Sequence, residues 1–473
     1  MYVPWYRNLA GGRGHGFQMN TSFFGELLQS ISERGRSLIE RGRGRYDDAA
    51  QRSETLVELC EELLSGRGEA SGVALAREIL ARYTDMTTGP RIAFFEALAT
   101  RFGPDNTRLD AAVEAWRARP SDATAAEVHA AAEPRRQELL RRLNLAPGGT
   151  KALVAMREQL LSALEHRDDL AAVDADFVHL FTAWFNRGFL VLRRIDWATP
   201  AIVLEKIIRY EAVHEIDDWD DLRRRIDPPD RRCYAFFHPA LIDEPLIFVE
   251  VALMRDTPDA IAPILGANRA TVAPDSAVTA TFYSISNCQR GLAGVTFGHF
   301  LIKQVVEEIS REFPRLSTFV TLSPVPNFAT WLGRECAREG ASLLADADRA
   351  VLAGLDTAWG NDPAATERLR EPLLRAAATY FLRAKNRASL PLDPVARFHL
   401  GNGASLERLN WPADLSERGR QQSHGLMVNY LYDLGDIERN HEAYAEHRTV
   451  VAASSIRRLV RAPASDLVVA IRE

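Results

Sequence analysis

The spacing of apolar residues changes character along the chain. From about Thr21 to Phe185 they recur at intervals of three and four in one segment after another, and each segment has a charged opposite face. Pro90, Pro120 and the Pro147–Gly149 turn separate these segments at lengths typical of short helix connections. The pattern predicts an all-α helical bundle that serves for packing and for contacts in a homo-oligomer.

Near Gly188 the pattern shifts toward the alternation typical of strands. A helix is expected between the first strands, from Pro200 to Ile216, and a further helical region from Trp331 to Leu382. We therefore predict a multi-domain α and α/β protein. Residues 1–187 would form the helical domain, with the first 20 or so residues as a flexible tail, and residues 188–473 a mixed-sheet α/β domain. Strands are expected at 189–192, 232–238, 246–254, 278–286, 316–323, 406–411 and 426–432.

The stretch from Ser276 to Phe328 reads as strand, glycine-rich loop, helix and strand. A period of two places Phe282, Ser284 and Ser286 on one face of the first strand and Tyr283 on the other. In the second strand Ser323 would be the last residue, because Pro324 forces the residue before it into an extended conformation. The expected helix carries Leu301, Ile302, Val305, Val306, Ile309 and Phe313 at helical spacing.

The loop between this strand and helix contains Gly291, Gly294 and Gly298. Free N–H groups at a helix N-terminus behind flexible glycines are typical of phosphate sites. Many such loops are purely structural, so the loop alone only suggests phosphate binding.

Composition excludes several classes of protein. Of 473 residues, 46% are apolar and 26% charged, which is typical of a globular protein, and the net charge of −6 does not favour nucleic-acid binding. No apolar run approaches the length of a membrane span. The four cysteines have no metal-binding or disulfide-framework spacing, so free thiols in a reducing, cytoplasmic compartment are expected. The first 25 residues carry Arg7 and Arg13 without an acidic residue but lack the apolar core of a secretory signal.

Several sequence blocks, in order, resemble the malonyl-CoA decarboxylase family. They are WATPAIVLEKIIRYEAVHEI, RRCYAFFHP, FYSIS, GLAGVTFGHFLIK, TLSPVPNF, FHLGNGA and GLMVNYLY, and they span roughly Phe185 to Tyr444. The resemblance implies a catalytic domain similar to the GNAT acetyltransferase superfamily. It also implies conversion of malonyl-CoA to acetyl-CoA and carbon dioxide.

The same resemblance implies site residues. Ser323 in TLSPVP and His399 in HLGNG match the family's active serine and histidine; without it, a strand-end serine and a lone histidine are more often structural. Ser284, Ser286 and Tyr432 match positions around the substrate pocket. The loop implied to bind the CoA pyrophosphate comprises Gln289, Arg290, Gly291, Leu292, Ala293, Gly294, Val295, Thr296, Phe297 and Gly298.

The chain departs from the family at Thr296, where a glutamate is expected. If an acidic group is needed in the site, another residue must supply it, and Glu407 and Asp433 are candidates. The sequence does not choose between them.

Decarboxylation of a malonyl thioester leaves an enolate that needs hydrogen-bond donors and then a proton on its α-carbon. Because a thioester is itself an electron sink, we expect no metal, biotin or pyridoxal phosphate. Neither a nucleic-acid nor a membrane partner is expected. Two alternatives remain open: a GNAT-type acyl-CoA-dependent N-acyltransferase, and a catalytically inactive CoA-binding regulator.

Overall fold

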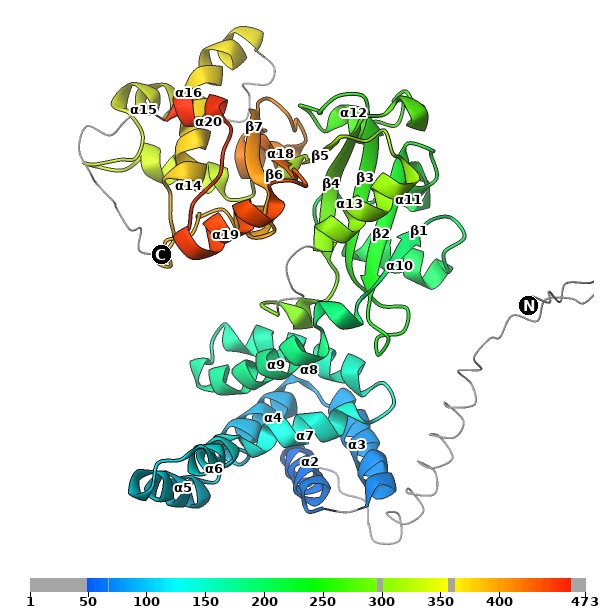
Figure 1. The fold of residues 1–473 in the computed structure, drawn as a ribbon, viewed down its shortest axis with the longest axis vertical. Helices are drawn as coiled ribbons and strands as arrows, with labels where there is room; N and C mark the ends of the chain where they lie inside the picture. Colours follow the sequence, from blue (N-terminus) through cyan, green and yellow to red (C-terminus); the bar gives the residue numbers. More distant parts are fainter. Residues whose placement is uncertain (1–48, 67, 296–300, 356–361, 461–473) are drawn as a thin grey trace, which may run out of the picture. The chain divides into compact units, whose positions relative to one another are not determined.

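The computed structural model describes residues 49–66, 68–295, 301–355 and 362–460. The chain divides into two compact units, one up to Phe177 and the other from Val178 onward (Figure 1). The predicted combination of an N-terminal helical part and a mixed-sheet α/β part is confirmed. Among the described residues, no helix is long and apolar enough to cross a bilayer.

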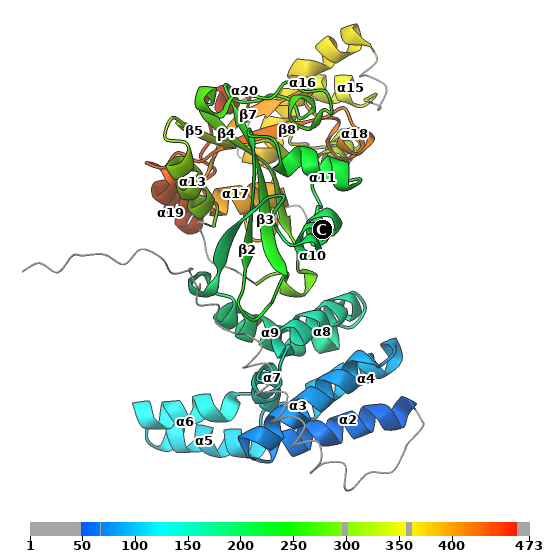
Figure 2. The ribbon, with the colours of Figure 1, turned by 90° about the vertical axis from the view of Figure 1, so that its right-hand side faces the viewer.

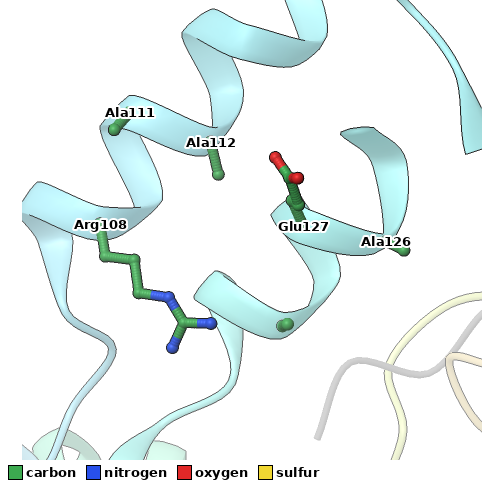
Figure 3. Close-up of a pocket in the computed structure, with 6 residues that line it drawn as sticks. Arg108, Ala111, Ala112, Ala126 and Glu127 are labelled. Carbon is green, nitrogen blue, oxygen red and sulfur yellow. The ribbon is translucent and has the colours of Figure 1, made fainter. Parts of the chain in front are cut away.

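The first unit is built from amphipathic helices with buried Leu and Phe side chains in their interior. Two of them, α5 and α6, form a hairpin lined with alanine, and a cavity of about 500 Å³ lies between Arg108 on α5 and Glu127 on α6 (Figure 3). The helices are α2 (Ala49–Leu64), α3 (Glu69–Thr84), α4 (Thr88–Thr100), α5 (Asn106–Ala118), α6 (Asp122–Ala132), α7 (Arg135–Asn144), α8 (Gly149–Leu164) and α9 (Ala171–Trp184), the last of which continues into the second unit.

The second unit is organised around one sheet of eight strands in the order β1-β2-β3-β4-β5-β8-β6, with β7 paired to β8. Among the described strands, only β4 and β5 run parallel. The strands are β1 (Val191–Ile195), β2 (Arg231–Phe237), β3 (Pro245–Met254), β4 (Thr279–Asn287), β5 (Thr318–Thr321), β6 (Ser323–Pro324), β7 (Ser405–Asn410) and β8 (Met427–Leu431).

Helices cover both faces of this sheet (Figure 2). On one face, α10 and α11 bury Ile207 and Ile226 in an apolar cluster with Cys233 of β2. On the other face lies α13, whose Glu312 pairs with Arg232 of β2. The helices of this unit are α10 (Ala201–Tyr210), α11 (Trp219–Ile226), α12 (Ala262–Leu265), α13 (Leu301–Glu312), α14 (Phe328–Cys336), α15 (Asp346–Leu352), α16 (Pro363–Leu382), α17 (Pro394–Gly401), α18 (Glu417–Ser423), α19 (Ile437–His447) and α20 (Ser454–Leu459).

A β-bulge in β4 corrects the expected strand faces. Glu250 of β3 pairs with Ser284, whereas its neighbour Val251 pairs with Phe282, so Tyr283 is an extra residue. Adjacent residues of β3 point to opposite faces, and their partners on β4 do the same. The prediction that Phe282 and Ser284 share one face was therefore wrong. Phe282 lies on the α13 side, and Ser284 and Ser286 lie on the α10 side.

One other detail differs from the sequence prediction. The strand expected to run without a break to Ser323 is divided into β5 and β6, which pair with β8 at different places. This break depends on β8, which is distant in sequence. The helix α17 carries His399 in its last turn and ends at Gly401, and the turn that follows has a φ of 84° at Gly403.

Candidate active site

A chain of hydrogen bonds joins Ser323, His399 and Tyr432. The Ser323 hydroxyl lies 3.1 Å from His399 Nε2, and His399 Nδ1 lies 2.8 Å from the Tyr432 hydroxyl. On its other side, the Ser323 hydroxyl donates to Thr321 Oγ1 at 2.9 Å. The structure thus brings together the predicted serine and histidine, with one of the predicted pocket residues.

The bond from Ser323 to Thr321 favours one tautomer of the histidine. With the single proton of Ser323 directed to Thr321, His399 Nε2 carries a hydrogen and donates it to the serine oxygen. His399 Nδ1 is then the acceptor of the Tyr432 O–H group. With this arrangement of hydrogens, the polar hydrogens of Tyr432, His399 and Ser323 each have an acceptor.

Burial controls the protonation of the site. Ser323, His399 and Tyr432 are only 6%, 3% and 1% exposed. Burial lowers the pKa of His399 to about 3 and raises the pKa of Tyr432 well above its usual range. The imidazole is therefore neutral at physiological pH, and the site has two neutral donors in a dry environment.

Local structure holds these side chains from several directions. Asp393 caps α17 by accepting from Ala396 N at 2.7 Å, and it fixes the helix that carries His399. The ring of Tyr430 stacks on the imidazole with centroids 4.5 Å apart. Both Tyr430 and Tyr432 come from β8 and the residue that follows it, and Ser323 pairs with Val428 of the same strand. The strand β8 therefore sets the position of the serine and of the histidine's neighbours.

Next to the hydrogen bonds of Ser323, His399 and Tyr432, the strands β4 and β5 stop pairing. The parallel ladder ends at the Phe282–Thr321 pair and one further bond from Leu322 N to Phe282 O. Beyond this point β4 continues to Asn287, while Ser323 pairs with β8 instead. The Phe282 ring contacts the Tyr432 ring with centroids 6.3 Å apart, so the separation of the strands lies beside the Ser323–His399 pair.

Ser284 and Ser286 are placed in a different network. Both hydroxyls donate to the carboxylate of Glu211, Ser284 at 2.7 and 2.8 Å and Ser286 at 3.3 Å. No hydrogen bond between either serine and Ser323 or His399 occurs among the described residues. Sequence reasoning missed Glu211, although its place at the end of a strongly amphipathic helix was a usable signal.

The glycine-rich loop is described as far as Val295, whereas Thr296, Phe297 and Gly298 lie outside the described residues. Gln289 Nε2 donates to the Pro245 carbonyl at 3.1 Å, and residues 290–292 form a 3-10 turn. Gly294 has a φ of 75°, and a Cβ there would meet nothing within 4 Å. The loop thus has open space beside a backbone conformation that favours glycine.

Neither candidate for a replacement acid belongs to the hydrogen-bonded chain. Asp433 is exposed and accepts from Gly435 N at 2.9 Å, and Glu407 is half-buried at the irregularity of β7. Within the described part of the chain, no cluster of His, Cys, Asp and Glu residues has the arrangement needed to hold a metal ion. A buried carboxylate that contacts the end of β4 is that of Glu211, which accepts from Ser284 and Ser286.

Both parts of the chain match known protein families. Residues 188–469 match the family described as "Malonyl-CoA decarboxylase C-terminal domain", and residues 102–185 match "Malonyl-CoA decarboxylase N-terminal domain". A protein of Anser anser anser named "Malonyl-CoA decarboxylase, mitochondrial" is 34% identical over 458 residues, 89% of each chain. The Rattus norvegicus protein of the same name is 37% identical over 352 residues, 69% of this chain and 71% of its own.

Solved structures give the same result. The crystal structure of malonyl-CoA decarboxylase from Rhodopseudomonas palustris is 60% identical with a TM-score of 0.83, covering 86% of this chain and 99% of its own. That from Agrobacterium vitis is 54% identical with a TM-score of 0.83, covering 86% and 100%.

Together with these matches, three structural features define an enzyme of the carboxy-lyase class. They are the helical unit, the sheet in which β4 and β5 separate, and the buried serine–histidine pair. The chain belongs to the malonyl-CoA decarboxylase family. The animal relatives are named mitochondrial, so the cytoplasmic location expected from the sequence stays a prediction.

Proposed function

We propose that this enzyme converts malonyl-CoA to acetyl-CoA and carbon dioxide, with Ser323 and His399 as its catalytic residues. The observation that carries the proposal is the 3.1 Å contact between these two side chains, inside a domain that matches the family from residue 188 to 469. Both side chains are buried, which strengthens their interaction with a charged substrate.

On substrate binding, Ser323 would turn its proton from Thr321 to the malonyl carboxylate, and His399 would bind the same carboxylate through its Nε2–H group. In the free enzyme His399 is neutral, because burial lowers its pKa to about 3. A bound carboxylate favours the imidazolium, so substrate binding brings a proton from solvent onto the ring. The carbon–carbon bond then breaks, its electron pair passes to the enolate, and carbon dioxide leaves.

His399 would next return its proton to the α-carbon, which gives acetyl-CoA and the neutral imidazole. Each turnover therefore consumes one proton from solvent. When the ring is protonated, its Nδ1 becomes a donor to the Tyr432 oxygen, and the proton of Tyr432 becomes available to an oxygen of the substrate. This assigns Tyr432 to substrate binding.

This assignment separates the pair from the serine–histidine pairs of hydrolases. A serine nucleophile needs an unprotonated ring nitrogen to accept its proton. Here the serine proton goes to Thr321, and His399 Nε2 is a donor. The arrangement favours binding and protonation over attack on the thioester.

The CoA part of the substrate would lie along the open edge of β4, with its pyrophosphate on the N–H groups of the loop from Gln289 to Gly298. The positive φ of Gly294 and the free space beside it support a close approach of phosphate oxygens in the described part of this loop. Ser284 and Ser286 would contact the same ligand from β4.

The direct test is incubation of the purified protein with malonyl-CoA alone. Decarboxylation predicts stoichiometric acetyl-CoA and carbon dioxide, and Ser323→Ala and His399→Ala should lose about 10²–10⁴-fold in kcat. Both variants should retain CoA affinity. An N-acyltransferase would form almost no product without an added amine, and a CoA-binding regulator would form none at all.

We further propose that no cofactor is needed, because the thioester accepts the electrons of the broken bond. Activity should survive extensive dialysis against a chelator and should not respond to avidin or to hydroxylamine. A homo-oligomer formed through the helical unit also stays a proposal, which light scattering of the full chain and of a chain without α5 and α6 would test.

A further inference from the structure

Thr321 is the last residue of β5, at the break before β6. The register of these two strands places it opposite Tyr430 of β8. The Tyr430 N–H group donates to the Thr321 hydroxyl oxygen at 3.1 Å, and the Thr321 carbonyl accepts from the Asn429 side chain at 2.7 Å. Side-chain groups therefore contribute to the bonding between the strands at this point, and they give the Thr321 hydroxyl a fixed place.

The same hydroxyl accepts the proton of Ser323 at 2.9 Å. A hydroxyl oxygen has two lone pairs, and the Tyr430 N–H and Ser323 O–H groups occupy both. Thr321 is fully buried, so solvent does not compete for this oxygen. Among the described residues, the hydrogen-bond partners of the Ser323 hydroxyl are Thr321 Oγ1 and His399 Nε2. The Ser323 proton therefore goes to Thr321 and not to the imidazole.

The direction of this proton matters because acetyl-CoA, the product of the proposed reaction, is still a thioester. It lacks the carboxylate that draws the Ser323 proton during decarboxylation. If this proton pointed to a bare His399 Nε2, the serine oxygen would be an activated nucleophile for the thioester carbonyl. An oxygen–carbon bond would form, the carbon–sulfur bond would break, and His399 would pass the serine proton to the leaving sulfur. Water would then hydrolyse the acetyl ester to acetate and restore the serine hydroxyl.

We propose that Thr321 is a positioning residue that holds the Ser323 proton away from His399 and so protects acetyl-CoA from hydrolysis by the pair. The inference rests on the proposed function. Ser323 Oγ and His399 Nε2 lie 3.1 Å apart, the distance that a nucleophile and its base need, so distance does not prevent this reaction. The polarity of the hydrogen bond prevents it, and Thr321 sets that polarity by accepting the Ser323 proton.

Thr321→Val removes the acceptor and nearly keeps the shape of the side chain. In this variant, the tautomer with hydrogen on His399 Nε2 leaves the Ser323 hydrogen without an acceptor. The tautomer with hydrogen on Nδ1 leaves the Tyr432 hydrogen without one. Because each tautomer then has one such hydrogen, both are populated. The fraction with a bare Nε2 should rise at least about fivefold, the range of one buried hydrogen bond.

The test incubates the full chain with acetyl-CoA and measures free CoA by chromatography. The wild type should release CoA only at the rate of a blank without enzyme, and Thr321→Val should release it at least about fivefold faster than the blank. Thr321→Ser keeps a hydroxyl at this position and should behave as the wild type. Adding Ser323→Ala to Thr321→Val should return the release to the blank rate, because the nucleophile is gone.

Thr281→Val is the matched control. Thr281 of β4 is also fully buried, and its hydroxyl has no hydrogen-bond partner among the described residues, so this variant should leave the release at the blank rate. If Thr321→Val does not fold, nitrogen-15 spectra of the wild type labelled at histidine decide the question. The His399 signals, identified by their loss in His399→Gln, should show hydrogen on Nε2 and none on Nδ1.

A merely structural role for Thr321 would lower the melting temperature of Thr321→Val without any release of CoA. Equal release by a folded Thr321→Val and by the wild type, Thr321→Ser or Thr281→Val would overturn this inference alone. Release that persists after Ser323→Ala, or a bare Nε2 in the wild-type spectrum, would also overturn it. A wild-type enzyme that forms no carbon dioxide from malonyl-CoA would overturn the proposed function, and this inference with it.

Discussion

The Ser323 hydroxyl and the His399 imidazole lie 3.1 Å apart although 76 positions separate them in the chain. Ser323 comes from β6 and His399 from α17, and β8 contacts the surroundings of both. The pair is therefore a product of tertiary structure, and changes to its supports should affect catalysis as well as stability.

The pH dependence of the enzyme should report the neutral state of His399. Burial lowers the pKa of this residue to about 3, so above pH 4 its protonated fraction falls with each further pH unit. If substrate binding requires the imidazolium, kcat/KM should fall about tenfold per pH unit between pH 5 and 8. Initial rates at low substrate concentration measure this. A flat profile would mean that His399 acts as a neutral donor and that another group supplies the proton.

Replacing Tyr432 by Phe should impair catalysis with little change in shape. The variant leaves His399 Nδ1 without the donor that now lies at 2.8 Å, and this favours the other tautomer, with hydrogen on Nδ1 and none toward Ser323. We expect kcat to fall about a hundredfold. Tyr234→Phe, at a buried tyrosine of β2, is the control and should leave kcat unchanged. Equal rates for both variants would remove Tyr432 from the site.

Asp393→Ala should reduce both stability and turnover. Asp393 is buried and caps α17 through Ala396 N, so its loss should cost about 1–2 kcal/mol of unfolding free energy. Displacement of His399 on the frayed helix should lower kcat by about tenfold or more. Asp362→Ala removes the corresponding cap of α16 and should affect denaturant unfolding but not kcat. Equal kcat values for Asp393→Ala and Asp362→Ala would contradict the role of the α17 cap in positioning His399.

Glu250→Gln should stabilise the protein at alkaline pH. Burial, with the nearby charge of Glu211, raises the pKa of Glu250 to about 8, despite the opposing effect of Arg225. Between its unfolded pKa of about 4.5 and the folded value near 8, the native state holds a proton that the unfolded chain releases. Stability therefore falls as pH rises through this window, and glutamine removes that dependence.

The difference in melting temperature between Glu250→Gln and the wild type should grow from pH 5 to pH 8.5, by about 5 °C or more. The charge of the nearby Asp221 also raises the pKa of Glu250, so this charge must be the same in the variant and in the wild type. Glu438→Gln, at an exposed residue paired with Lys303, should show no such trend. A constant difference across the range would contradict the elevated pKa.

Gly403→Ala should be strongly destabilising. The residue has a φ of 84°, and a Cβ there would overlap the backbone carbonyl of Ile437, which cannot move away without shifting α19. We expect a loss of about 3 kcal/mol or more in chemical denaturation. At Gly354 a Cβ would meet nothing within 4 Å, so Gly354→Ala should lie within about 0.5 kcal/mol of the wild type.

Much of the fold is visible in the sequence because its strands are strongly apolar. The limits predicted for β2 and β3 agree with the structure to within one residue. The sequence blocks that resemble the family point to Ser323 and His399. The bulge at Tyr283 could not be predicted, since it is a mismatch between β4 and β3 and neither strand alone shows it. For the same reason Glu211 was missed: its partners lie on β4, far along the chain.

The position of β8 within the sheet has a consequence for synthesis. The strand lies between β5 and β7 and supplies the backbone partners of Ser323, yet it ends only at Leu431. A nascent chain on the ribosome can complete the helical unit and β1 to β4 well before this strand emerges. The growing polypeptide should therefore be inert toward its substrate until Leu431 has left the ribosome.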